Sequence, residues 1–179
     1  TRGNSERGID ISPNTEPAFL ITVNKIVSDF KMLPVKLYVS KILRNETSIT
    51  SQHKTINYLD NILAKNEAKK NEYDDVLFLN SKKKACCAST SNLFYLERGK
   101  IYTPPLKDGV LNGTIREILI SKKKVAVKSI TLNNLKNCNE IFITNSIFGI
   151  RPVAKIGKQK FKVGQKINEI NDFLTKLGL

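Results

Sequence analysis

The sequence has 179 residues, of which 40% are hydrophobic, and it carries 30 Lys and Arg against 16 Asp and Glu. A chain of this size and composition can bury one sizeable core, and its net charge of +14 favours anions at the surface. No apolar run approaches the roughly 18 residues that a membrane-spanning helix requires. The first residues do not have the basic and apolar pattern of a leader peptide either. We therefore expect a cytoplasmic protein with no membrane partner.

The three cysteines, Cys86, Cys87 and Cys138, do not have the spacing of a CxxC metal or redox site. Reduced thiols and no metal are the simplest interpretation. The lysine runs at 82–84 and 122–124 have no aromatic residues between them, as a platform for stacking nucleic-acid bases would have. We interpret these runs as solvated turns and keep a basic nucleic-acid binder as the less favoured alternative.

The first half of the chain predicts a strand and a helix. Residues 18–23 are rich in apolar and β-branched side chains, which favours a strand. Residues 57–70 place Leu59, Ile62 and Leu63 at helical spacing. We therefore expect an amphipathic helix that packs this apolar stripe on a sheet.

Further along the chain, short apolar runs between polar turns predict strands at residues 76–79, 93–96, 125–127 and 140–144. Residues 114–121 favour a helix. A second helix, over 165–177, is predicted by the stripe of Ile167, Ile170, Phe173, Leu174 and Leu177. Strands and helices do not alternate regularly, so the expected fold class is α+β rather than a doubly wound sheet.

Lys54 stands immediately before the first predicted helix, where a side chain can project from a rigid element into a cleft. A lysine that is neutral part of the time can form a Schiff base, and burial or a nearby cation promotes the neutral form. Taken alone, however, this position favours an ordinary surface lysine. The residues that follow decide how it is interpreted.

Two polar turns could bind an anion. The glycine turn from Gly109 to Gly113 leads into the helix that begins near Thr114, and the free amides and dipole of a helix start attract negative charge. Any loop that enters a helix has such amides, so the signal is weak by itself. The turn at 144–146 follows a predicted strand, and its alternative interpretation is a strand end capped by Asn and Ser.

Several short motifs occur in a recognisable order. They are Thr-Arg-Gly-Asn-Ser-Glu-Arg at 1–7, Lys-Thr-Ile-Asn at 54–57, Cys-Cys-Ala at 86–88, Asn-Leu-Phe at 92–94, Tyr-Thr-Pro-Pro-Leu at 102–106 and Leu-Asn-Gly-Thr-Ile-Arg at 111–116. Together they resemble the fold-type IV pyridoxal-phosphate enzymes, the class IV aminotransferase family of branched-chain and D-amino-acid aminotransferases and aminodeoxychorismate lyase. The resemblance covers essentially the whole chain.

The resemblance implies a mixed sheet or barrel with flanking helices. Residues 1–28 would be the end of a small N-terminal domain and the linker, and residues 29–179 the large domain that binds pyridoxal 5'-phosphate. Most of the small domain, including the arginine that normally binds the cofactor phosphate, would then be missing from this sequence. Family members are homodimers with sites near the interface, so a homodimer is also implied.

The resemblance assigns cofactor roles to individual residues. Lys54 would bind the cofactor covalently and act as the catalytic base, and Tyr58 would hydrogen-bond the ring oxygen. The alternative for Tyr58 is a helix tyrosine that is half in the core. Leu111 would pack on the ring face. The phosphate would be bound by the backbone of Thr114 and Ile115 and by the hydroxyl of Ser146.

The substrate roles fall on Arg7 and Asn145. Arg7 resembles the arginine that reaches across the dimer to the substrate carboxylate in D-amino-acid aminotransferases, a task for which a planar guanidinium is well suited. An arginine in an exposed turn is the alternative. The histidine that assists there is replaced by Ile9, which favours another substrate.

One departure concerns the ring nitrogen of the cofactor. The family has a glutamate five residues before the Asn of Asn-Leu-Phe, where it keeps that nitrogen protonated. Cys87 has this spacing, whereas aligning the cysteine pair places Ala85 there. Because neither residue is acidic, the change leaves elimination less impaired than transamination, or it marks an inactive protein.

Within the family, several short motifs most resemble aminodeoxychorismate lyase, which releases pyruvate and 4-aminobenzoate for folate synthesis. The resemblances that favour it are the cysteine pair, the Val-x-Asn-Gly pattern at 110–113 and Asn145, which opens an Asn-x6-Pro-Val segment. The expected substrate is therefore a small carboxylate. A branched-chain or D-amino-acid aminotransferase and a catalytically degenerate member of the family remain the alternatives.

Overall fold

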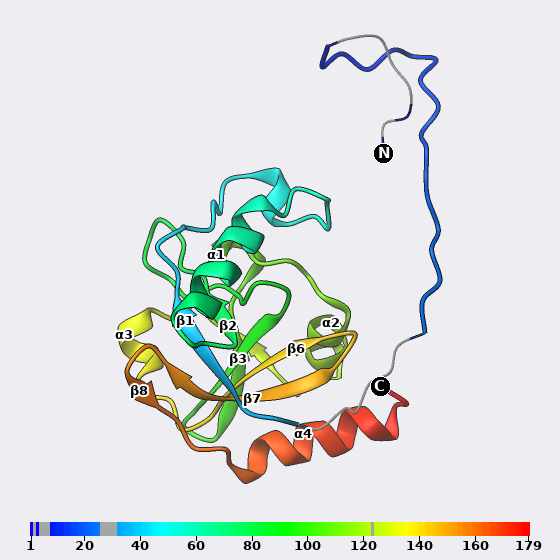
Figure 1. Cartoon of the computed structure of the whole chain (residues 1–179). Coiled ribbons are helices and arrows are strands. Elements are labelled where there is room, and N and C mark those ends of the chain that lie inside the picture. The colour runs from blue at the N-terminus through cyan, green and yellow to red at the C-terminus, as the bar shows by residue number, and fades with distance from the viewer. Residues whose placement is uncertain (2, 4–7, 26–31, 123) are drawn as a thin grey trace.

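The computed structural model describes residues 1, 3, 8–25, 32–122 and 124–179. Its centre is a mixed sheet, eight-stranded over these residues, with helices on its outside (Figure 1). The strands are β1 Val35–Val39, β2 Asp75–Leu77, β3 Asn92–Glu97, β4 Lys100–Thr103, β5 Ala126–Val127, β6 Ile141–Asn145, β7 Gly149–Ile156 and β8 Gln159–Lys160. The α-helices are α1 Leu59–Lys70, α2 Thr114–Ser121, α3 Leu132–Leu135 and α4 Gln165–Lys176, and the 3-10 turns are η1 Ile49–Ser51 and η2 Leu106–Asp108.

The strands follow the order β2-β1-β7-β6-β3-β4-β5, and β8 pairs with β7. Strands β1, β2 and β7 are mutually parallel where they pair, as are β4 and β5. The pairs β7·β6, β6·β3 and β3·β4 are antiparallel. This mixed order, without regular strand and helix alternation, agrees with the expected α+β class.

The central strands β3 and β6 are buried on both faces. Because successive side chains of a strand point to opposite faces, Leu93 and Ile143 join one apolar cluster while Phe94 and Phe142 join another. The two phenylalanine rings stack with centroids 4.8 Å apart. Side chains from α2 and α4 cover this second face, which explains why the strands read as continuous apolar runs.

The four strands predicted over 76–144 and the helices predicted over 114–121 and 165–177 are confirmed within one or two residues at each end. The strand predicted at 18–23 is wrong. This segment belongs to no strand and extends away from the sheet, with Phe19 and Leu20 almost fully exposed (Figure 1). A segment with high β-propensity forms a strand only where a neighbouring strand can pair with its backbone hydrogen-bonding groups.

Helix α1 exists where the sequence predicts it, but it buries a different face. Leu59, Ile62 and Leu63 are at least half exposed, whereas Ala64 and Ala68 are fully buried against the strand residue Val76. Small side chains let the helix backbone approach the sheet closely. The helix is therefore positioned by its alanines and not by its larger apolar residues.

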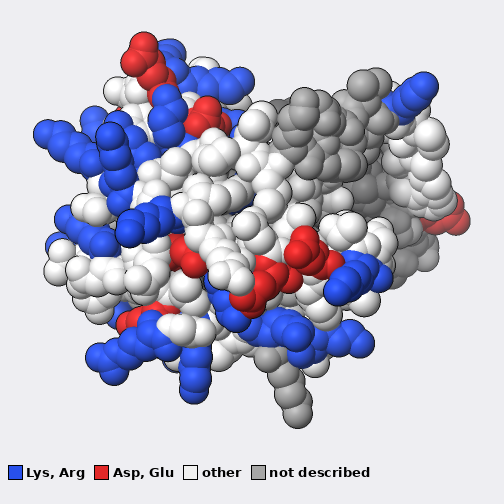
Figure 2. Space-filling model, turned by 90° about the horizontal axis from the view of Figure 1, so that it is seen from below, with Lys and Arg blue, Asp and Glu red and all other residues white. Residues whose placement is uncertain are grey.

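Two surface properties follow from the fold. Among the described residues, no helix is long and apolar enough to cross a lipid bilayer. On the face shown in Figure 2, lysine and arginine side chains are spread around the edges with acidic side chains among them. The excess positive charge on this face is therefore distributed rather than continuous.

Helix α4 begins on a buried carboxylate from another part of the chain. Its N-cap is Gly164, which has no side chain to accept a hydrogen bond, and the backbone N–H of Ile167 donates instead to Glu140 Oε2 at 3.1 Å. A Cβ at position 164 would lie 2.3 Å from this carboxylate. A side chain at position 164 would therefore displace the Glu140 carboxylate from the helix start.

We predict that Glu140→Ala lowers the free energy of unfolding by about 1–2 kcal/mol, because it removes the cap and leaves the buried Ile167 amide unpaired. Glu169→Ala is the matched control, since this exposed residue of α4 only pairs with Lys166. The control should change stability by less than about 0.5 kcal/mol. Urea denaturation followed by circular dichroism measures both, and equal effects of the two variants would contradict the capping role.

Candidate functional site

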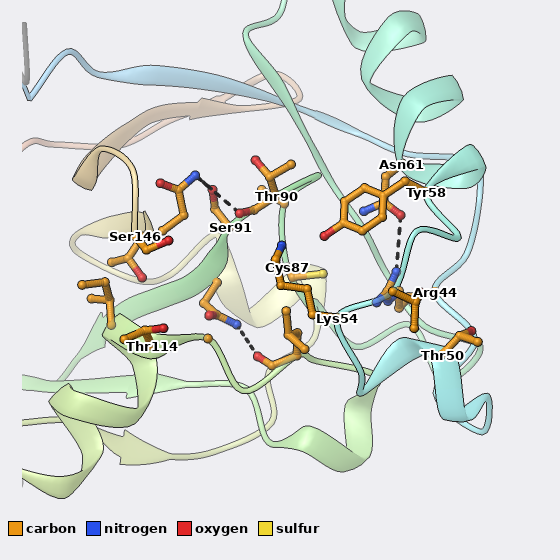
Figure 3. Close-up of a pocket in the computed structure, with 18 of the residues that line it drawn as sticks. Arg44, Thr50, Lys54, Tyr58, Asn61, Cys87, Thr90, Ser91, Thr114 and Ser146 are labelled. Carbon is orange, nitrogen blue, oxygen red and sulfur yellow. Dashed lines mark hydrogen bonds between the residues drawn. The ribbon is translucent and has the colours of Figure 1, made fainter. Parts of the chain in front are cut away.

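A pocket lies where the segment before α1, the ends of β3 and β6 and the start of α2 meet (Figure 3). Its walls come from distant parts of the sequence. The lining residues are Arg44, Thr50, Lys54, Thr55, Asn57, Tyr58, Asn61, Cys87, Ala88, Thr90, Ser91, Asn92, Leu111, Gly113, Thr114, Ile115, Thr144, Asn145 and Ser146. Every residue of our candidate site except Arg7 is among them, and Arg7 lies outside the described residues.

One wall of the pocket is the start of α2. Its N-cap is Gly113, which has no side chain to accept a hydrogen bond from the first amides of the helix. Asn92 of β3 fixes this end, because its Nδ2 donates to the Leu111 carbonyl at 2.8 Å. A Cβ at position 113 would lie 2.3 Å from Asn92 Oδ1, so any side chain there would displace Asn92. The arrangement presents backbone N–H groups and the positive end of the helix dipole to the pocket.

Lys54 and Tyr58 come from the segment that leads into α1. The Lys54 ammonium nitrogen lies 5.7 Å from the centre of the Tyr58 ring, within cation–π range. Figure 3 shows the lysine extending between the wall that carries Tyr58 and the wall that carries Thr114 and Ser146. Lys54 is exposed on the pocket side and Tyr58 is half-buried. The amine is therefore accessible to a ligand in the pocket.

Arg44 holds this wall together and was missed by the sequence analysis. Its guanidinium donates from Nε to the Gly109 carbonyl at 3.0 Å and from Nη2 to the Ser51 carbonyl at 2.9 Å. A third hydrogen bond, of 3.4 Å, runs from Nη1 to Asn61 Oδ1 (Figure 3). Asn61 Nδ2 in turn donates to the Ser89 carbonyl. No short motif marks Arg44, since its partners lie up to 65 residues away in the sequence.

The charged side chains that line the pocket are all cationic within the described residues. Arg44 and Lys54 are its cationic side chains, and its described lining contains no aspartate or glutamate. The remaining polar groups are neutral hydroxyls and amides. A site with two cations, helix-start amides and several hydroxyls can bind an anion such as a phosphate or a carboxylate.

Cys87 and Ala85, the two residues considered for the ring-nitrogen position, lie in different surroundings. Cys87 lines the pocket, whereas Ala85 is fully buried in the main apolar cluster. Burial raises the pKa of the Cys87 thiol to about 11. The charge of Arg44 lowers this pKa in part, and the charge of the buried Asp75 raises it. At neutral pH this position therefore presents a neutral thiol, and not a carboxylate, to the pocket.

The phosphate group of pyridoxal phosphate fits the residues present. The amides at Thr114 and Ile115, the exposed Ser146 hydroxyl and a buried hydroxyl at Thr144 surround the same space, and the accessible amine of Lys54 also lines it. Thr144 Oγ1 has no hydrogen-bond partner within the described residues. The fit is incomplete at the ring nitrogen, because no carboxylate of the described lining is available to pair with it.

The buried position of Cys87 predicts that its thiol loses its proton only at high pH. We expect iodoacetamide to alkylate Cys87 slowly in the folded protein at pH 8.5 and faster as the pH approaches 11, since only the thiolate reacts. The urea-unfolded chain should react with a midpoint near the ordinary thiol pKa of about 8.5. Tandem mass spectrometry of a Cys86→Ala background locates the label. A midpoint near 8.5 in the folded protein would contradict this assignment.

The sequence matches the family described as Amino-transferase class IV over residues 1–156. Among curated proteins it is 31% identical over 139 residues to a probable branched-chain-amino-acid aminotransferase of Aquifex aeolicus, covering 73% of this chain and 45% of that protein. It is 28% identical over 180 residues to aminodeoxychorismate lyase of Bacillus subtilis, covering 98% of this chain and 61% of that protein. The chain thus spans about half the length of these relatives.

The fold is also similar to solved structures. The branched-chain aminotransferase of Thermoproteus uzoniensis, determined with norvaline, aligns with a TM-score of 0.78 and 28% identity. The alignment covers 84% of this chain and 53% of that one. The relatives therefore include both branched-chain aminotransferases and an aminodeoxychorismate lyase, at similar sequence identity to this chain.

Proposed function

The chain belongs to the amino-transferase class IV family, and we propose that it contributes the large-domain part of a pyridoxal-phosphate site with 4-amino-4-deoxychorismate lyase activity. The observation that carries the proposal is the pocket that unites Lys54 with the start of α2. Lys54, Leu111 and Thr114 line it together although up to 60 residues separate them. Enzymes of this family use pyridoxal phosphate.

The start of α2 would hold the cofactor phosphate. The backbone amides at Thr114 and Ile115 and the hydroxyl of Ser146 are the proposed donors, and Leu111 is the proposed apolar contact for the ring. The N-cap glycine of α2 supports this assignment, because it has no side chain to pair with these amides. Asn92 and Gly113 would keep the donors in place.

Pyridoxal phosphate, when bound, supplies an aldehyde that reacts with amines and a conjugated ring that withdraws electrons. Lys54 would contribute the amine that binds this aldehyde and, once released, would accept and return a proton at its Nζ. Tyr58 would orient the lysine and hydrogen-bond the ring oxygen. The 5.7 Å separation of the Lys54 nitrogen from the Tyr58 ring centre supports a shared position for these two groups.

The neutral pocket wall at Cys87 supports elimination over transamination. A carboxylate beside the ring nitrogen would stabilise the protonated ring, which is the stronger electron acceptor. Cys87 cannot do this, because its thiol has a pKa of about 11 and is uncharged at neutral pH. The two cationic side chains and the absence of acidic lining favour an anionic substrate such as a dicarboxylate.

A branched-chain aminotransferase is the second candidate, favoured by the 31% identity to the Aquifex aeolicus protein. A D-amino-acid aminotransferase and a degenerate member without activity are further alternatives from the sequence. We also propose a homodimer in which Arg7, and Asn145 at the pocket edge, contact the substrate carboxylate. Asn145 is half-buried, and its Oδ1 accepts hydrogen bonds from the backbone N–H groups of Ile147 and Phe148.

We predict that pyridoxal phosphate gives the protein a near-ultraviolet or violet absorption band that borohydride reduction removes, with the label fixed on Lys54. Lys54→Ala should reduce the total label on the protein at least about tenfold, because the pocket then lacks its amine. Lys69→Ala, on the exposed face of α1, is the control and should leave the label unchanged. Peptide mass spectrometry measures both, and label spread evenly over surface lysines would contradict the assignment.

The reaction product separates the candidate activities. With pyridoxal phosphate present, we expect 4-aminobenzoate and pyruvate to appear in equal amounts from 4-amino-4-deoxychorismate. Chromatography detects the first product and a coupled lactate dehydrogenase assay the second. Glutamate formed from 2-oxoglutarate and a branched-chain amino acid would support the aminotransferase instead. If Lys54 is labelled but neither reaction occurs, the degenerate alternative is supported.

A further inference from the structure

Thr144 is a buried threonine whose hydroxyl makes no hydrogen bond with the described residues. The residue lies in β6 and is 1% exposed, and its Oγ1 has no hydrogen-bond partner in the described part of the chain. Burying a hydroxyl without a hydrogen bond is unfavourable. Thr144 also lines the pocket, so a ligand there could satisfy this group.

A second threonine of the same sheet shows the usual arrangement. Thr103 of β4 is fully buried, and its Oγ1 donates to the Leu93 carbonyl at 2.8 Å. The two residues thus share side chain, strand environment and burial. They differ in their hydrogen bonds: the Thr103 hydroxyl has a partner in the fold, and the Thr144 hydroxyl has none among the described residues.

The register of the sheet fixes the direction of the Thr144 side chain. Thr144 of β6 stands directly opposite Asn92 of β3 in an antiparallel pair. Directly opposed residues project to the same face, with Cβ atoms about 4.5–5.5 Å apart. Asn92 reaches from this face to Leu111 and Gly113 at the start of α2. The Thr144 side chain therefore projects toward the same helix end.

Two independent features meet at this point. The first is the start of α2, whose N-cap Gly113 has no side chain to pair with the helix amides. The second is the unpaired Thr144 hydroxyl on the facing strand. The surrounding pocket has cationic and neutral polar groups and no acidic residue among its described lining, so nothing in this part of the site repels an anion.

We propose that the Thr144 hydroxyl donates a hydrogen bond to a phosphate group seated at the start of α2. It is an additional ligand-binding residue beside the donors at Thr114, Ile115 and Ser146. The inference rests on the proposed function only for the identity of the natural ligand. The phosphate site itself follows from the fold and can be probed with inorganic phosphate.

The test compares Thr144→Val with Thr103→Val, two nearly isosteric changes. We expect Thr144→Val to weaken inorganic phosphate binding about 10- to 100-fold, as for a lost hydrogen bond to a charged group. Its stability without phosphate should be unchanged or higher, because an unpaired buried hydroxyl is removed. Thr103→Val should behave in the opposite way, with lower stability and unchanged phosphate affinity. Calorimetry and urea denaturation measure these quantities.

Thr144→Ser retains the hydroxyl and should keep phosphate affinity close to that of the unchanged protein. Pyridoxal, which lacks the phosphate, separates this inference from the proposed function. Thr144→Val should weaken the reaction of Lys54 with pyridoxal phosphate but not with pyridoxal. If Lys54 reacts with neither compound while phosphate binding still depends on Thr144, the proposed function fails and the phosphate site stands.

Three outcomes would overturn the inference. The first is equal phosphate affinity of the unchanged protein and Thr144→Val, which would mean that Thr144 binds only a water molecule. The second is no binding of inorganic phosphate by the unchanged protein. The third is a loss of stability in Thr144→Val as large as in Thr103→Val, which would assign the hydroxyl to the structure of the fold.

Discussion

The contact between Asn92 and the turn before α2 is the constraint on which the site depends. The side chain of Asn92 bonds the Leu111 carbonyl and packs so closely on Gly113 that a Cβ there would lie 2.3 Å from its oxygen. Strand β3 thereby sets the position of the first amides of α2. Because β3 pairs with β6, the same contact brings the helix start to Thr144 and Ser146.

The opposite wall is held by a different set of hydrogen bonds. Arg44 joins the carbonyls of Gly109 and Ser51 to the side chain of Asn61 in α1. Asn61 is buried in the helix because Arg44 and the Ser89 carbonyl satisfy its amide. The loop that carries Lys54 thus runs between two fixed points. A guanidinium suits this task because its five donors lie in one rigid plane.

These two walls give the pocket its chemical character. The pocket contains one accessible amine, that of Lys54, together with neutral hydroxyls and the amides at the start of α2. Its charged lining residues are cationic, so it is suited to an anionic ligand with an aldehyde group. Cys87 makes the wall beside them neutral, because its raised thiol pKa of about 11 leaves it uncharged at neutral pH. The divided similarity to lyases and aminotransferases agrees with a common scaffold whose reaction is decided by such single positions.

The sequence alone determined strands β2, β3, β5 and β6, the helices α2 and α4 and the motifs that meet in the pocket, because periodicity and turn residues are local properties. Tertiary structure decided which face of α1 is buried, since the sheet accepts Ala64 and Ala68 at close approach and leaves Ile62 in solvent. It also decided the roles of Arg44 and Thr144. Their surroundings come from residues distant in the chain, which no local pattern encodes.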